Sequence, residues 1–123
     1  MGTLVPHLLF RAEPGASPTA ALLRSAGYMV SKIDDDTIGV EIAGSDHVDG
    51  LVVELPTLAA INFVRRIEAR HDQNVVVLVV TQSVDALRRA LPQVRTIRTS
   101  EVQDDLISTI DLALVAHQMQ KTG

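Results

Sequence analysis

Glu54 is the side chain of this 123-residue sequence that is best placed to do chemistry. It follows the apolar run 51–53, which predicts a short buried strand, and Pro56 behind it can start a helix. An acid at the carboxyl end of a central strand lies where open α/β sheets form their ligand sites. Glu54 is therefore the first candidate for a reactive or an ion-paired carboxylate.

Other kinds of site find no support in the sequence. Cysteine is absent, which excludes thiolate metal sites, disulfides and thiol nucleophiles. The four histidines have no metal-ligand spacing, and neither a Gly-rich phosphate loop nor a Gly-x-Ser-x-Gly elbow occurs. One tyrosine, two phenylalanines and a net charge of −4 argue against a nucleic-acid partner. We therefore expect no metal, no cofactor and no catalytic residues.

Apolar runs and turn signals predict five strands that alternate with five helices. The strands are expected at 5–10, 28–33, 48–55, 75–80 and 94–98. The helices are expected at 17–27, from about 37, from 56, at 83–91 and at 101–118. Because the strands are almost continuously apolar, this alternation predicts one parallel sheet covered on both faces. A single α/β domain over residues 1–123 is expected, with a frayed tail after about 118.

Local signals predict where the helices begin and which side chains face inward. Ser17 is the expected N-cap of the first helix, with Pro18 at its first position and Gly27 at its end. The acidic turn 34–36 is expected to cap the next helix. In the helix from 56, the expected inner face repeats at helical spacing: Leu58, Ile61, Val64 (or Ala60) and Ile67.

The sequence also bears on cellular location. The N-terminus has no basic region followed by a long apolar run, so no signal peptide is expected. The longest apolar run, 75–80, is far shorter than the roughly 20 residues of a membrane-spanning helix. We expect a cytoplasmic protein with no membrane partner.

Four motifs, in this order, resemble those of a response-regulator receiver domain of the CheY type. The first is Leu8–Pro14, which looks like the family's apolar strand followed by Asp-Asp-Glu-Pro, and the second is Leu22–Tyr28, a helix ending in Gly-Tyr. The third is Asp49–Pro56, the central strand, and the fourth is Val79–Gln82, a strand ending in a hydroxyl residue. The resemblance implies a doubly wound, flavodoxin-like sheet of five parallel strands in the order 2-1-3-4-5, with five helices. It also implies a role in bacterial two-component signalling.

The resemblance places the functional positions of the family on residues that depart from its pattern. It assigns the phosphoacceptor position to Glu54, the acidic pocket to Arg11, Ala12 and Glu13, the switch position to Thr81 and the lysine position to Arg98. Glutamate thus replaces the acceptor aspartate, and arginine and alanine replace two acids that would help to bind magnesium. Because magnesium uses carboxylate oxygens, these changes predict a degenerate receiver without phosphotransfer.

The same residues suggest another use. If the first and third strands are neighbours, Arg11 and Glu54 emerge at the same edge of the sheet. We therefore predict that the Arg11 guanidinium pairs with the Glu54 carboxylate and takes the place of the metal.

The favoured function is a non-enzymatic signalling module that binds a protein partner, either another protein or a second copy of the chain. The resemblance places the contact on the fourth helix, fifth strand and last helix, where Arg88, Arg89 and Arg95 lie. Two alternatives remain: a working phosphoacceptor that uses Glu54 and Glu13, and a small-molecule or nucleotide sensor that uses Arg11, Thr81 and Arg98. The segment 83–91 also suggests an anti-anti-sigma-type domain as a rival fold.

Overall fold

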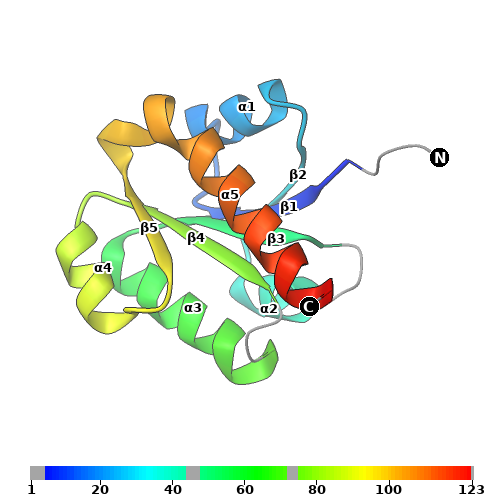
Figure 1. Ribbon diagram of the computed structural model, residues 1–123. Coiled ribbons are helices and arrows are strands. Elements are labelled where there is room, and N and C mark those ends of the chain that lie inside the picture. Colours follow the sequence, from blue (N-terminus) through cyan, green and yellow to red (C-terminus); the bar gives the residue numbers. More distant parts are fainter. Residues whose placement is uncertain (1–4, 44–47, 72–74, 123) are drawn as a thin grey trace.

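The computed structural model describes residues 5–43, 48–71 and 75–122 (Figure 1). The strands are β1 His7–Ala12, β2 Met29–Ile33, β3 Gly50–Glu54, β4 Val76–Thr81 and β5 Arg95–Arg98. The helices are α1 Pro18–Ser25, α2 Asp36–Ala43, α3 Thr57–His71, α4 Val84–Ala90 and α5 Val102–Thr122, and a 3-10 turn covers Thr99–Glu101. All strand pairs are parallel, and the sheet order is β2-β1-β3-β4-β5. The predicted fold class is confirmed.

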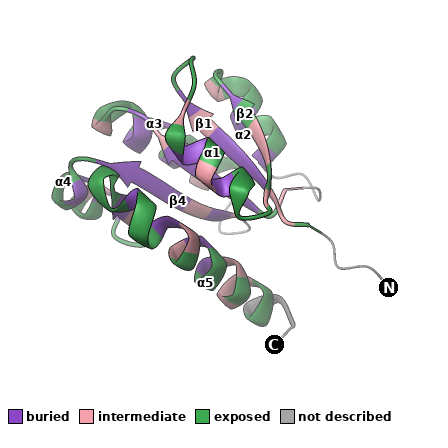
Figure 2. Cartoon of the chain, turned by 90° about the horizontal axis from the view of Figure 1, so that it is seen from above, coloured by how far each residue is buried: buried purple, intermediate pink, exposed green. Residues whose placement is uncertain are grey.

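Helices cover both faces of the sheet and leave the strands buried between them (Figure 2). On one face, α2, α3 and α4 pack on a core that includes Leu9, Val53 and Val79. On the other face, α1 and α5 pack on a core that includes Phe10 and Val52. Because side chains alternate along a strand, odd- and even-numbered positions of β1 serve different cores.

The predicted caps of α1 and α2 are confirmed. The Ser17 hydroxyl accepts a 3.4 Å hydrogen bond from the Ala20 N–H, and Pro18 opens the helix. Gly27 follows the helix with a φ of 100°, a left-handed conformation that favours glycine. At α2, Asp35 Oδ1 accepts a 3.1 Å bond from the Ile38 N–H. These caps fix the ends of the two short helices that flank β2.

Two details of the predicted elements are wrong. The first strand runs to Ala12 instead of ending at Phe10, so that Arg11 belongs to the strand. Leu58, expected on the inner face of α3, is 70% exposed, whereas Ile61, Val64 and Ile67 are buried. Leu58 precedes Val64 by six residues, so at about 100° per residue it lies roughly 120° from Val64 around the helix, away from the side on which Ala60 and Ile67 are buried. The limits of the domain and the frayed tail stay predictions.

Gly39 on α2 packs directly against Phe63 on α3. A Cβ atom at position 39 would lie 3.0 Å from the Phe63 Cζ atom and 3.1 Å from Cε1. This close approach brings α2 onto α3 and so positions the amino end of α2 beside β1.

Within the described ranges, no helix is long and apolar enough to cross a membrane.

Candidate functional site

The Glu54 carboxylate is held by hydroxyl groups at the start of α1. The Ser17 hydroxyl donates a hydrogen bond of 3.1 Å to Oε1, and the Thr19 hydroxyl donates one of 2.7 Å to Oε2. Thr19 is buried, and Glu54 is half-buried. Each carboxylate oxygen therefore has a donor from α1, and the amino end of that helix adds a favourable partial positive charge.

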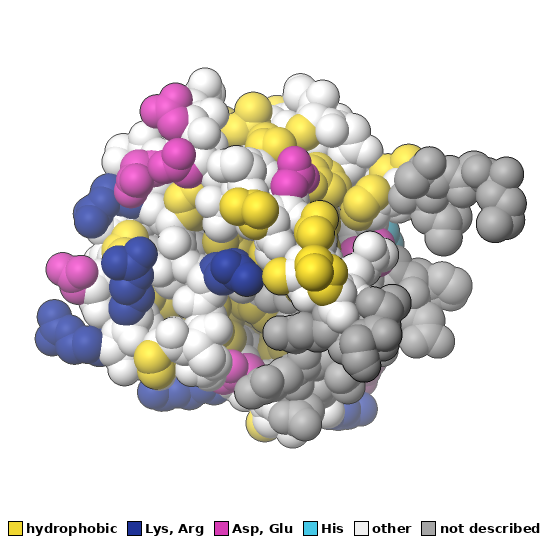
Figure 3. All heavy atoms as spheres, viewed as in Figure 1, with side chains coloured by type: hydrophobic (Ala, Val, Ile, Leu, Met, Phe, Trp, Pro, Cys, Tyr) yellow, Lys and Arg dark blue, Asp and Glu magenta, His cyan; other side chains and the backbone are white. Residues whose placement is uncertain are grey.

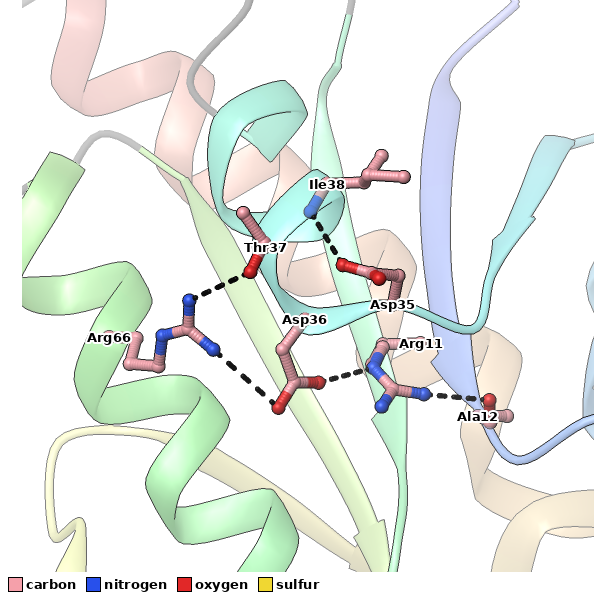
Figure 4. A network of polar contacts seen from close by, with 7 residues as sticks. All are labelled: Arg11, Ala12, Asp35, Asp36, Thr37, Ile38 and Arg66. Atoms are coloured by element: carbon pink, nitrogen blue, oxygen red, sulfur yellow. Dashed lines mark hydrogen bonds and ion pairs between the residues drawn. The ribbon is translucent and has the colours of Figure 1, made fainter.

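Arg11 binds Asp36 instead of Glu54 (Figure 4). Its Nε lies 2.6 Å from Asp36 Oδ1, and its Nη1 donates a 2.9 Å bond to the carbonyl oxygen of Ala12. Arg66 approaches the same carboxylate, with Nη1 3.8 Å from Oδ2. The predicted pair between Arg11 and Glu54 is therefore wrong.

The alternation of side chains along the strands explains this difference. In the sheet register, Arg11 is opposite Val53, and Ala12 is opposite Glu54. Val53 belongs to the core under α2 and α3, whereas Ala12 belongs to the core under α1 and α5. Arg11 and Glu54 do emerge at the same edge of the sheet, but on opposite faces.

Arg11 joins three elements on the face away from Glu54. Its guanidinium carbon lies 5.8 Å from the centre of the Phe63 ring, within the range of a cation–π contact. Its side chain is only 13% exposed. Arg66 also approaches Thr37, with Nη2 3.4 Å from the hydroxyl oxygen. This network ties β1 to α2 and α3, and it takes the Arg11 charge out of the site around Glu54.

A crevice of about 450 Å³ opens at the carboxyl ends of β3 and β4. We call it the strand-end crevice; its lining residues are Glu13, Glu54, Leu55, Pro56, Thr57, Val80, Thr81, Gln82, Ser83 and Thr99. Three of the predicted site residues, Glu13, Glu54 and Thr81, therefore line one surface. The buried Thr81 hydroxyl accepts a 3.0 Å hydrogen bond from the Ser83 N–H, which satisfies it locally.

The other three predicted site residues lie outside the strand-end crevice. Arg11 faces α2, as described above, and Ala12 is 4% exposed within the core under α1 and α5. Arg98 ends β5, where its Nε lies 3.5 Å from Glu101 Oε1. The hypothesis of a sensor that uses Arg11, Thr81 and Arg98 together loses its geometric basis, because Thr81 alone of the three lines the crevice.

Sequence reasoning missed several polar residues of the site. Thr57, Gln82, Ser83 and Thr99 line the crevice because each closely follows the end of a strand, a signal that the sequence does contain. Ser17 was expected only as a helix cap, and it also binds Glu54. Thr19 carries no such signal, because its partner is 35 residues away in the sequence.

Solved receiver structures share this fold. A response regulator receiver protein from Sinorhizobium medicae is similar over 92% of this chain and 97% of its own, with a TM-score of 0.72 and 15% identity. The receiver domain of a sensor histidine kinase from Pseudomonas aeruginosa is similar over 81% of this chain and 93% of its own, with a TM-score of 0.58 and 20% identity. The chain has the receiver fold. No family model and no curated protein matches the sequence.

The Pseudomonas structure has a magnesium ion coordinated in its active-site cleft. Magnesium takes oxygen ligands in near-octahedral geometry and commonly uses carboxylates. At the end of β1 here, Ala12 offers only a methyl group, and Arg11 is a cation already bound to Asp36. Among the described residues, no group of three or more His, Cys, Asp or Glu could hold a metal ion. The residues present do not fit a magnesium site of this kind.

Proposed function

We propose that this chain is a receiver-fold signalling module that acts through protein–protein interaction in a bacterial two-component-type pathway, without phosphotransfer at Glu54. The observation that carries the proposal is the set of groups around the Glu54 carboxylate. Its carboxylate is bound by Ser17 and Thr19, and the positions that the resemblance assigns to the acidic pocket hold Ala12 and an Arg11 that faces the other side of the sheet.

The chemistry of acyl phosphate formation supports this proposal. A carboxylate attacks a phosphoryl group only if positive charge neutralises the phosphoryl oxygens, and a divalent cation normally supplies that charge. The two nearby arginines do not supply it, because Arg11 pairs with Asp36 and Arg98 pairs with Glu101. Glutamate is also one methylene longer than aspartate, and a misplacement of about 1 Å can cost roughly 100-fold in rate.

We place the partner contact on the surface formed by α4, β5 and α5, which we call the docking face. Arg88, Arg89 and Arg95 are exposed there, and α5 adds three exposed apolar side chains: Leu112, Val115 and Met119. Figure 3 shows hydrophobic side chains gathered over α5, with basic side chains over α4 and β5. An exposed apolar strip beside charged residues is typical of a protein interaction site. A second copy of the chain is one partner that fits.

Incubation with acetyl phosphate and magnesium, followed by intact-protein mass spectrometry, tests the loss of phosphotransfer. We expect no phosphoryl adduct on the wild-type chain, and none on the Glu54→Gln variant that serves as its control. A receiver domain with the full set of acids, treated in parallel, should gain the mass of one phosphoryl group. An adduct that is present in the wild type and absent from Glu54→Gln would establish the alternative, an atypical receiver switched by phosphorylation.

A further inference from the structure

The strand-end crevice has the polarity of a cation site. Among the described residues that line it, the ionisable side chains are the carboxylates of Glu13 and Glu54, and the other polar groups are hydroxyls and one amide. The amino end of α3 also borders the crevice, through Pro56 and Thr57. Its partial charge of about +0.5 is outweighed by two full negative charges. A phosphate group would therefore meet net repulsion here.

Glu54 is oriented in advance for a ligand in this crevice. Ser17 and Thr19 each donate one hydrogen bond to it, so its rotamer is set before any ligand arrives. A carboxylate has about four lone-pair sites, and these two bonds use two of them. The remaining acceptor capacity belongs to a side chain that lines the crevice. A ligand that binds Glu54 consequently loses little side-chain entropy in fixing it.

From this arrangement we infer that the strand-end crevice binds a guanidinium group, such as an arginine side chain. A guanidinium is planar and permanently charged, and its fork of N–H donors matches the two oxygens of a carboxylate. The hydroxyl oxygens of Thr57, Ser83 and Thr99 offer further acceptors for the remaining N–H groups. The crevice volume of about 450 Å³ accommodates such a side chain.

This inference rests on the proposed function, because a crevice that works by binding magnesium and a phosphoryl group would not also hold an organic cation. The proposed function and the binding of a guanidinium can be refuted separately. A phosphoryl adduct in the mass spectrum would overturn the proposed function. A chain that forms no adduct and binds no guanidinium would overturn only the inference made here.

The test is an amide NMR titration of the full chain with Nα-acetyl-arginine methylamide. The matched probes are the citrulline analogue, which has the same shape without the charge, and inorganic phosphate. We expect saturable shifts centred on Glu54, Thr81 and Ser83 with the arginine probe and no saturable shift with the other two. Shifts of equal size with citrulline, or tighter binding of phosphate, would overturn the inference.

Three isosteric variants locate the binding. Glu54→Gln should weaken the arginine probe about tenfold, because a charge-assisted bidentate contact is lost. Glu13→Gln, at an exposed position on the rim, should weaken it about threefold. Glu41→Gln removes an exposed charge on α2, outside the crevice, and should change the affinity less than about twofold. Unchanged affinity in Glu54→Gln, or an equal loss in Glu41→Gln, would contradict the assignment.

A short peptide distinguishes the two sources of a guanidinium. The peptide Gly-Ala-Arg-Ala-Gly carries the same group on a polypeptide backbone. If it binds more tightly than the methylamide probe, the natural ligand is an arginine of a protein partner. Equal binding assigns the crevice to a free guanidinium compound. Failure of both probes to bind would refute the inference.

Discussion

In the register of β1 and β3, Arg11 lies one position before the residue that is opposite Glu54. This offset decides what each side chain can bind. Arg11 is opposite Val53 and points toward α2, whereas Glu54 is opposite Ala12 and points toward α1. Two opposite charges at the same edge of a sheet therefore find separate partners. Glu54 keeps its negative charge uncompensated by any arginine among the described contacts, which gives the strand-end crevice its polarity.

A double-mutant cycle can verify these partners. Arg11→Met and Asp36→Asn should show a coupling free energy of about 1–2 kcal/mol, because they share a charge-assisted hydrogen bond. The partial exposure of Asp36, 34%, keeps this value at the lower end for ion pairs. The control cycle of Arg11→Met with Glu54→Gln should be additive within about 0.5 kcal/mol. Urea unfolding of the wild type and the variants measures both; a larger coupling in the control cycle would restore the pair predicted from the sequence.

Thr19 makes the shorter of the two contacts to Glu54, and its substitution tests the support from α1. Thr19→Val keeps the shape of the side chain and removes the donor, so the free energy of unfolding should fall by about 1–3 kcal/mol. Thr109→Val on α5 is the control, since Thr109 is a half-buried residue and its hydroxyl makes no hydrogen bond among the described residues. We expect the control to change stability by less than about 0.5 kcal/mol. Equal losses in both variants would mean that the bond to Glu54 contributes nothing.

The sequence predicted which residues reach the edge of the sheet but not which faces they take. The first strand was expected to end at Phe10. Because it extends to Ala12, Arg11 is part of the strand, and its side chain points to the face opposite that of Ala12. The partners of Glu54 were beyond sequence reasoning for another reason. Thr19 lies inside a helix, and its contact depends on how α1 docks on the sheet, which no local pattern encodes.

At the scale of elements, apolar side chains occupy two sides of α5. Leu106 and Ile110 are buried against the sheet, and Leu112, Val115 and Met119 are exposed. The fold was predictable because strands such as 76–81 are almost wholly apolar and alternate with helices. The exposed apolar side of α5 was not predictable. Which of its apolar side chains are buried depends on how the helix packs on the sheet.

Two leucine substitutions separate the sides of α5. Leu106→Ala should lower the free energy of unfolding by about 2–5 kcal/mol, because it leaves a cavity in the core under α1 and α5. Leu112→Ala, at a position that is 68% exposed, should change it by less than about 0.5 kcal/mol. Chemical denaturation at low protein concentration is the measurement. A loss above 2 kcal/mol for Leu112→Ala would mean that α5 packs with its other side inward.

At the scale of the whole molecule, the two proposed sites lie on different parts of the receiver fold. The strand-end crevice is built from the ends of β3 and β4, and the docking face is built from α4, β5 and α5. The docking face carries arginines on α4 and β5 and Asp105 on α5, which lines one hollow with Arg88 and Arg98. Opposite charges on one face become complementary when two copies are related by a twofold axis.

Sedimentation velocity over a range of concentrations tests the docking face. We expect a reversible dimer that Leu112→Asp weakens about tenfold or more, because a carboxylate would be buried in the contact. Leu58→Asp is the matched control, since Leu58 is equally exposed on α3 but lies outside the docking face. Acetyl phosphate with magnesium should leave the dimer unchanged. A dimer that forms only with the phosphodonor, or that both variants weaken equally, would contradict the proposed function.

The contact between Gly39 and Phe63 limits how this protein can change over generations. A larger residue at position 39 meets the Phe63 ring at once, whereas a smaller residue at position 63 leaves glycine in place without a clash. A side chain at position 39 is therefore accepted only if the Phe63 ring gives way by a few tenths of an ångström or is replaced by a smaller residue. When both positions are randomised together and folded variants are selected, a larger residue at position 39 should occur with a smaller residue at position 63 more often than chance predicts.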